Sequence, residues 1–372
     1  MAMTVPFYDI RGQYQELAPE LDAAVHRVMA SGVYTISGGT ENPAFEQEFA
    51  RFQSQAEGFH AIALSSGTDA LRIMMDAAGI GPGDEVITTA FTFVASVETI
   101  VQTGATPVFA DINPRTFMLD PSAVEAAITS RTKAILPVHL FGAMAEMEAF
   151  QGIADRHGLI LLEDAAQAVE SSRHGRRAGT MSLASAFSFY VTKNLGAAGD
   201  GGLILTQDAA FAERCRSMRV HGMGRERYFY DHLGYTARLD EIQAAVLRVK
   251  LRALPAWTER RRAIARLYNQ ALGGPYLEDP AGMTYHQYSV LLEERDDVQR
   301  RLKEKGIDSF VYYPVPIHFH APYRQFGKGE GSLPITESVA RRILALPIAP
   351  HVSDEQAEYV AAAVQMATQV PA

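Results

Sequence analysis

Short apolar runs alternate with stretches of helical spacing along the first half of the chain. The runs at 59–66, 84–93, 106–112, 132–142 and 159–164 are largely apolar and end near turn residues, so each predicts a buried strand. The segments at 67–79, 94–104, 122–129 and 146–158 place apolar residues at helical spacing. This alternation predicts an α/β domain with a mostly parallel sheet that helices cover on both faces.

The pattern changes after a further apolar run at 201–206. A long helical stretch follows at 238–272, and we expect Pro255 to break it, because proline lacks the backbone N–H and its ring disturbs a helix interior. Beyond Gly273 the pattern predicts a smaller α+β domain, with helices at 296–306 and 353–369, a strand at 308–315 and a loop at 326–332. We therefore divide the chain into a large domain, 1–250 with the N-terminal segment, and a small domain, 251–372.

Composition and charge exclude several classes of protein. The 372 residues are 47% apolar and 21% charged, which is ordinary for a globular protein and argues against disorder, collagen and coiled coil. No apolar run reaches the roughly 18 residues of a membrane span, and the start resembles neither a signal nor a transit peptide, so we expect a cytoplasmic protein. The net charge of -9 argues against nucleic acid as a partner. We interpret the single Cys215 as a helix thiol.

One of the six lysines stands out by its surroundings. Lys193 lies between the apolar run "FSFYV", which predicts a buried strand, and the turn "GAAGDGG", while the others, Lys250 included, are expected to be surface charges. An amine among apolar groups is more easily neutral and nucleophilic, as a Schiff-base lysine must be. Alone, the stretch is more typical of a lysine that extends from a strand end into solvent, and other residues must shift that balance.

Two further motifs precede this lysine. Asp164 ends the apolar run "LILLED", at the edge of an α/β sheet where ligands bind, and it suits the pyridinium nitrogen of pyridoxal phosphate. Alternatively, it caps the next helix. The turn "SSGTDAL" has Ser66, Gly67 and Thr68 at a predicted helix start, which is typical of a phosphate site but also of an ordinary helix cap. It matches neither the dinucleotide nor the nucleoside-triphosphate motif.

Together these motifs resemble the DegT/DnrJ family of nucleotide-sugar aminotransferases, which have fold type I and use pyridoxal phosphate. The resemblance runs from "VPFYDIRGQY" through "SSGTDAL", "EDAAQA" and "FSFYVTKNLGAAGDGG" to "YYPVPIH". It implies that Lys193 holds the cofactor as a Schiff base, Asp164 pairs with the pyridinium nitrogen and Gln167 contacts the phenolic oxygen. It also implies that Gly67, Thr68 and Ser188 hold the phosphate and that Phe93 stacks on the ring.

The resemblance also implies a reaction and partners. We expect a homodimer with a shared active site that transfers an amino group, with glutamate as donor, to a keto-sugar nucleotide. The turn containing Asp200 is similar to that of members acting on 3-keto sugars, which favours a 3-keto-6-deoxyhexose linked to dTDP or a similar nucleotide; a 4-keto sugar or a cyclitol is the alternative. A non-catalytic regulatory protein that binds the cofactor is a further alternative.

The remaining site predictions concern the substrate and the partner subunit. The family commonly has Asn, which reaches the partner's cofactor phosphate, where Thr236 stands here, and the shorter side chain weakens that expected contact. Tyr34, Tyr190, Tyr313 and His318 are candidate substrate contacts, although packing explains each tyrosine equally well. His318 and His320 share no recognisable third ligand, so we expect no metal.

Overall fold

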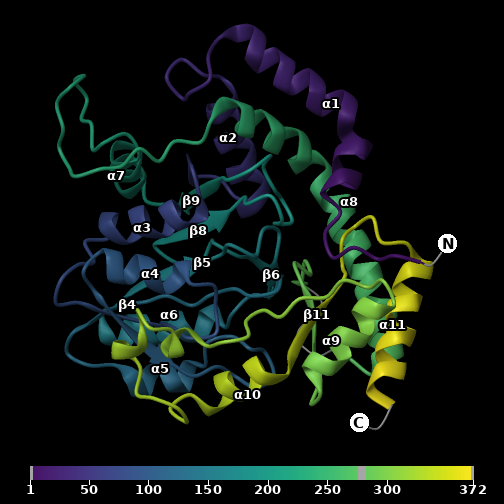
Figure 1. Cartoon of the computed structure of the whole chain (residues 1–372). Helices are drawn as coiled ribbons and strands as arrows, with labels where there is room; N and C mark the ends of the chain where they lie inside the picture. Colours follow the sequence, from purple (N-terminus) through teal and green to yellow (C-terminus); the bar gives the residue numbers. More distant parts are fainter. Residues whose placement is uncertain (1–2, 275–281, 370–372) are drawn as a thin grey trace.

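A seven-stranded sheet forms the centre of the large domain. The computed structural model describes residues 3–274 and 282–369, and its main sheet has the strand order β1-β9-β8-β5-β4-β2-β3 (Figure 1). The strands are β1 His60–Leu64, β2 Glu85–Thr89, β3 Thr106–Ala110, β4 Thr132–Ile135, β5 Ile160–Asp164, β8 Ala184–Ser188 and β9 Gly202–Thr206. Only β9 is antiparallel, to both β1 and β8; the other pairs are parallel. The predicted mostly parallel α/β sheet is confirmed.

Helices cover both faces of this sheet. They are α2 Glu41–Ser54, α3 Gly67–Ala77, α4 Ala95–Gln102, α5 Pro121–Ala127, α6 Met147–His157 and α7 Ala209–Arg219. Helix α1, Ile10–Ser31, packs on another helix instead, and β6 Ser172–Arg173 and β7 Arg176–Arg177 form a small separate hairpin. Leu203 and Leu205 of β9 belong to one apolar core, whereas Ile204 between them belongs to another. Because both faces are buried, the strands carry continuous apolar runs rather than alternating ones.

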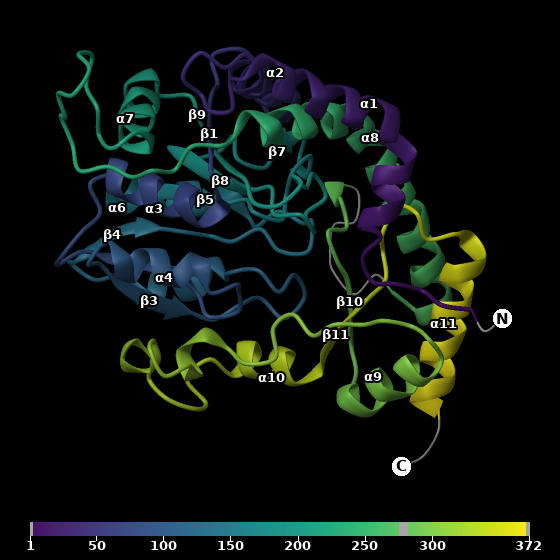
Figure 2. The same ribbon diagram turned by 45° about the horizontal axis from the view of Figure 1, so that its top comes forward.

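A single long helix joins the two domains. Helix α8, Glu241–Leu272, packs against α1, α2 and α11, as both views show (Figures 1 and 2). The expectation that Pro255 breaks this helix is wrong: the helix continues through it. Trp257, Arg261 and Ile264 beyond the proline are buried, so tertiary packing offsets the hydrogen bond that proline removes. The division predicted at residue 250 falls inside this helix.

The small domain is built on a two-stranded antiparallel sheet. It contains β10 Tyr288–Leu291, β11 Ile343–Leu346, α9 Arg295–Glu304, α10 Pro334–Arg342, α11 Asp354–Gln369 and the 3-10 turns η2 Ile317–Phe319 and η3 Arg324–Phe326. The strand predicted at 308–315 is wrong, because only Phe310 makes a bridge, to Ala345. Pro314 and Pro316 cannot donate to a strand ladder and end the pairing.

The N-terminal segment contacts the small domain. Val5 forms a parallel bridge with Ile307, although the sequence pattern placed this segment with the large domain. Both ends of the described chain therefore lie on the side of the molecule that α11 covers (Figure 2). Across residues 3–274 and 282–369, each helix is either too short or too polar to cross a membrane.

Candidate active site

Most of the predicted site residues lie together in one cavity at the carboxyl edge of the sheet. Its volume of about 480 Å³ lies in the range of small-molecule sites. Nine of the twelve predicted site residues line it: Gly67, Thr68, Phe93, Asp164, Gln167, Ser188, Tyr190, Lys193 and Tyr313. They converge because β1, β5 and β8 all end at this edge, although residues 67 and 193 lie far apart in sequence.

Lys193 lies in the turn after β8 rather than at the end of a longer strand. The predicted strand "FSFYV" ends at Ser188, and the backbone N–H of Lys193 donates to the carbonyl oxygen of Tyr190 at 2.8 Å. Burial lowers the pKa of the Lys193 amine to about 8, and the charge of Asp164 opposes this shift only in part. About a tenth of the amine is therefore neutral at pH 7, far more than for a solvated lysine.

Asp164 is the last residue of β5, directly beside β8. Its Oδ2 accepts a hydrogen bond from the Ser96 hydroxyl at 2.7 Å, and its Oδ1 accepts one from the backbone N–H of Ala166 at 3.1 Å. Burial raises the pKa of this carboxyl, while Ser96 and the charge of Lys193 favour its ionised form. A cationic group bound opposite Asp164 would keep this buried carboxyl in its ionised form, because it would stabilise the negative charge.

The turn from β1 into α3 has the geometry of an anion site. A side chain at Gly67 would place its Cβ 2.7 Å from the Cβ of Ser188, so only glycine lets this turn lie against the end of β8. Thr68 and Ser188 line the cavity beside the first N–H groups of α3. The Ser66 hydroxyl, in contrast, donates to the carboxylate of Asp69 at 2.8 Å and caps the helix by accepting from the Asp69 N–H.

Gln167 is held from two sides. Its Oε1 accepts from the backbone N–H of Phe141 at 2.8 Å, and its Nε2 donates to the hydroxyl of Tyr313 at 3.0 Å. Phe93 lines the same cavity and remains 56% exposed, which leaves its ring available to a flat ligand.

Three predicted residues do not line this cavity. Tyr34 is 45% exposed and its hydroxyl donates to the carbonyl oxygen of Met29. His318 is buried, with its Nε2 3.5 Å from the Oε1 of Glu337. Thr236 is exposed, and its hydroxyl lies 2.9 Å from the Nε2 of His221. Within the residues that the structure describes, no three His, Cys, Asp or Glu side chains gather as metal ligands.

The sequence pattern missed several residues of the cavity wall. Tyr8, His286, Gln287 and Tyr312 come from the N-terminal segment and the small domain, and only their polar or aromatic character in otherwise apolar stretches distinguishes them. The expectation for Lys250 is also wrong. Its amine is buried and donates to the carbonyl oxygen of Gly196 at 2.9 Å, so it supports the turn that follows Lys193.

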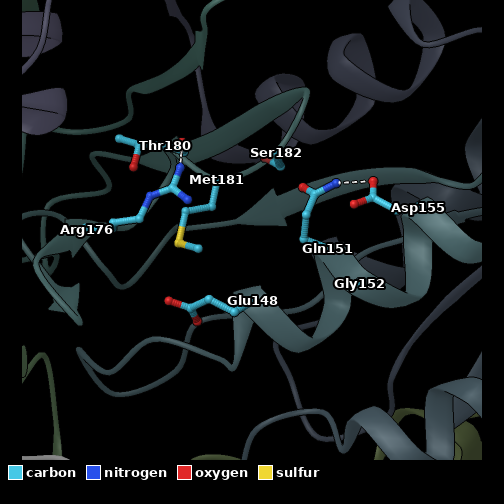
Figure 3. A pocket seen from close by; sticks show the side chains of 8 residues that line it. All are labelled: Glu148, Gln151, Gly152, Asp155, Arg176, Thr180, Met181 and Ser182. Atoms are coloured by element: carbon cyan, nitrogen blue, oxygen red, sulfur yellow. Dashed lines mark hydrogen bonds between the residues drawn. The ribbon is translucent and has the colours of Figure 1, made fainter.

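A second hollow on the surface has a different character. Figure 3 shows it between α6 and the loop around Thr180, with Glu148, Gln151 and Arg176 among its side chains. Gln151 already donates to Asp155 and Arg176 to the carbonyl oxygen of Thr180. The described residues that line this hollow include no lysine and no glycine turn at a helix start. The cavity of Lys193 is therefore the better candidate for the active site.

The cavity combines a buried lysine with a lowered pKa, a buried carboxyl and the turn at Gly67, which suits a phosphate (the phosphate turn); this is the arrangement expected of an enzyme that binds a phosphorylated carbonyl compound. The chain belongs to the DegT/DnrJ/EryC1/StrS aminotransferase family, whose model matches residues 15–365.

Named relatives and solved structures cover nearly the whole chain. It is 45% identical to a dTDP-3-amino-3,4,6-trideoxy-alpha-D-glucose transaminase of Streptomyces venezuelae over 97% of this chain and 95% of that protein. It is 46% identical to a "pleiotropic regulatory protein" of Geobacillus stearothermophilus over 96% of this chain and 97% of the other. The structure of S. venezuelae DesV in complex with a ketimine intermediate matches with a TM-score of 0.94 and 44% identity, over 99% of this chain and 100% of that one.

The residues of the cavity fit pyridoxal phosphate. The neutral fraction of the Lys193 amine suits its aldehyde, the buried Asp164 carboxylate suits its ring nitrogen, and the N–H groups at the start of α3 suit its phosphate. Gly67 leaves that turn free of any side chain. The predicted cofactor is thus consistent with the donors, acceptors and space that the chain provides.

Proposed function

We propose that the protein uses pyridoxal phosphate to transfer an amino group from an amino acid, glutamate in our proposal, to a keto-sugar nucleotide. The observation that carries the proposal is the meeting of Lys193 and Asp164 in one cavity beside the phosphate turn. The name of the S. venezuelae transaminase supports an amino-sugar product, and the ketimine in the DesV complex supports amino-group transfer.

Each residue has a separate role in this proposal. Gly67, Thr68 and Ser188 would hold the phosphate, Phe93 would cover the ring, and Gln167 would hydrogen-bond the ring's hydroxyl. The bound cofactor supplies an electron sink that weakens the bonds at the adjacent carbon. Asp164 would keep positive charge on the ring nitrogen. The Lys193 amine would hold the cofactor until the donor's amine displaces it, and as the free base it would then take a proton from the donor carbon. In the second half of the reaction it would return a proton to the sugar carbon.

We place the amination at carbon 3 of a 6-deoxyhexose linked to dTDP. Asp200 lines the cavity in the turn "GAAGDGG", which resembles the turn of enzymes that act on 3-keto sugars. The name of the S. venezuelae relative also specifies a 3-amino sugar. A 4-keto sugar or a cyclitol is the alternative substrate. We propose the cytoplasm as the location, since nucleotide sugars are used there.

The test is an assay of purified protein with glutamate and a panel of 3-keto and 4-keto sugar nucleotides. We expect 2-oxoglutarate to form in proportion to an amino sugar whose new amine, located by NMR, is on carbon 3. An amine on carbon 4 would move the substrate to the alternative class. Tight binding of every sugar without any product would instead support the regulatory alternative, which the name of the G. stearothermophilus relative raises.

A homodimer with a shared active site is part of the proposal. The loop before Thr236 exposes Tyr228 at 68%, Phe229 at 65% and Leu233 at 93%, and such a run of exposed apolar side chains suits burial against a second copy. In that arrangement Thr236 and the loop lie near the partner's phosphate turn.

Replacing Leu233 with aspartate should weaken the dimer and lower activity, which sedimentation and assay at a series of protein concentrations would measure. Met366→Asp is the matched control, because Met366 is also exposed, at 55%, but lies on α11. Mixing Lys193→Ala with a loop variant that is inactive as a dimer should restore up to about a quarter of wild-type activity if sites are shared. No recovery after verified subunit exchange would contradict sharing.

A further inference from the structure

Two residues of the cavity wall have no role in the proposal so far. His286 and Gln287 lie just before β10, on the segment by which the small domain reaches the site, and both line the cavity with Lys193. Their exposed fractions are 4% and 2%. The segment is fixed close to the large domain, because Gly142 has its α-carbon against it: a Cβ there would lie 2.7 Å from the backbone nitrogen of His286.

The hydrogen bonds around His286 determine which ring nitrogen carries the proton. The Nδ2 of Asn194 donates to the carbonyl oxygen of Thr284 at 2.9 Å, so the other atom of that amide is an acceptor. This acceptor, Oδ1, lies 3.2 Å from the Nδ1 of His286, which must therefore be the protonated nitrogen. In the neutral ring the Nε2 then carries a lone pair, and it has no hydrogen-bond partner in the described part of the chain.

The Gln287 side chain is also unpaired. Its backbone N–H donates to the carbonyl oxygen of Phe141, which fixes the main chain. Its Oε1 is buried and has no partner among the described residues, and no side-chain hydrogen bond of its amide is present there. Buried polar groups are nearly always satisfied, so an unpaired amide in the wall of a cavity indicates a ligand group that pairs with it.

The chemistry of these two side chains selects the ligand group. Burial and the nearby cations Lys193 and Arg261 hold the pKa of His286 well below its ordinary value, so the ring stays neutral. Carboxylate and ionised phosphate oxygens only accept hydrogen bonds and cannot pair with the lone pair of Nε2. A hydroxyl both donates and accepts, and it can use the imidazole and the amide together.

We propose that His286 and Gln287 bind a hydroxyl group of the keto sugar, with the Nε2 of His286 as the hydrogen-bond acceptor and the Gln287 amide beside it. The proposal rests on the proposed function and adds a specificity contact to it. Asn194, the residue after Lys193, orients the imidazole through its hydrogen bond to Nδ1. One hydrogen bond therefore links the proposed sugar contact to the neighbour of the reactive lysine. The ammonium group of the amino-acid donor could also donate a hydrogen bond to Nε2, and the test distinguishes this group from a sugar hydroxyl.

The experiment compares each keto-sugar nucleotide with an analogue in which one ring hydroxyl is replaced by hydrogen. In the wild-type enzyme, removal of the contacted hydroxyl should lower kcat/KM by about tenfold or more. In Gln287→Met and in His286→Phe the two substrates should differ by only about two- to threefold, because each variant removes one of the two partners of that hydroxyl. The reaction with glutamate alone, monitored through the cofactor's absorbance, is measured in the same variants, because a loss confined to it would assign the contact to the donor instead of the sugar.

Two controls keep the result specific. Gln287→Met leaves the bond between His286 and Asn194 in place, so it tests the contact even if His286→Phe loses the cofactor or fails to fold. Calorimetric binding of the same sugar pair measures the contact without turnover, so failure of the proposed function is distinguishable from failure of this contact. Full wild-type discrimination in both folded variants, or a loss confined to the glutamate reaction, would overturn the proposal.

Discussion

Replacing Lys193 with alanine should lower transamination by about 10²–10⁴-fold, since no other lysine lines the cavity in the described part of the chain and proton transfer by a positioned group contributes about that factor. The protein should still fold, because this side chain donates no hydrogen bond on which the core depends. An assay of amino-sugar formation would measure the change in rate. Absorbance would show whether the yellow colour expected of pyridoxal phosphate bound to a lysine is lost.

Borohydride trapping provides the matched comparison. In the wild-type protein the reduced cofactor should be found on Lys193. Lys250→Met is the control, because Lys250 is also buried and its pKa is also lowered to about 8, yet its amine bonds to Gly196 outside the cavity wall. Trapping should persist in that variant. Unchanged activity in Lys193→Ala would refute the role of the lysine.

The pH dependence of cofactor capture follows from the lowered pKa of Lys193. The neutral amine is the nucleophile, and with a pKa of about 8 its fraction rises as pH increases from 7 and levels off above 9. Capture of pyridoxal phosphate by the cofactor-free protein should therefore accelerate by about tenfold between pH 7 and 9. A rate that keeps rising towards pH 10.5 would show an ordinary, solvated amine.

Replacing Asp164 with asparagine should lower turnover by about 10²–10⁴-fold while the fold is kept, because an amide of the same shape accepts the Ser96 hydrogen bond but cannot stabilise a positive charge on the ring nitrogen. Turnover and thermal unfolding would be measured together.

The neighbouring carboxylate offers a control of equal burial. Glu163 accepts hydrogen bonds from His139, Ser182 and the backbone N–H groups of Gly179 and Met181, away from the cavity. Glu163→Gln should therefore lower stability and leave the turnover of the folded protein nearly intact. Wild-type rates in Asp164→Asn, or equal losses in both variants, would contradict the assignment.

Local pattern predicted the large domain well because its strands are buried on both faces. The apolar runs that form β1, β3 and β5 can be recognised as strands from their own residues. Asp164 and Lys193 could be singled out because they are charged residues at or just after such runs, near the sheet edge. The strand at 308–315 could not be judged this way. Tyr312 and Tyr313 line the cavity while Phe310 packs against Phe7, and Pro314 cannot donate to a strand ladder, so the β-propensity of the tyrosines does not decide the structure.

Long-range packing explains what the sequence pattern missed. Pro255 is tolerated because α8 is surrounded by other helices, and Lys250 is buried because a carbonyl oxygen lies within reach of its amine. His286 and Gln287 enter the site only when the small domain folds against Gly142. None of these contacts has a periodic signature in the chain, whereas the motif residues Gly67 and Asp164 each stand at a predicted strand end.

The continuity of α8 has a consequence for how the protein melts. Leu254 and Tyr268 of this helix share one apolar core with Phe187 of the large domain and Leu344 of the small domain. This core is therefore shared between the two domains, and a chain cut at residue 250 would expose apolar surface on both fragments. The two domains should lose their structure together, in a single cooperative transition rather than in two steps.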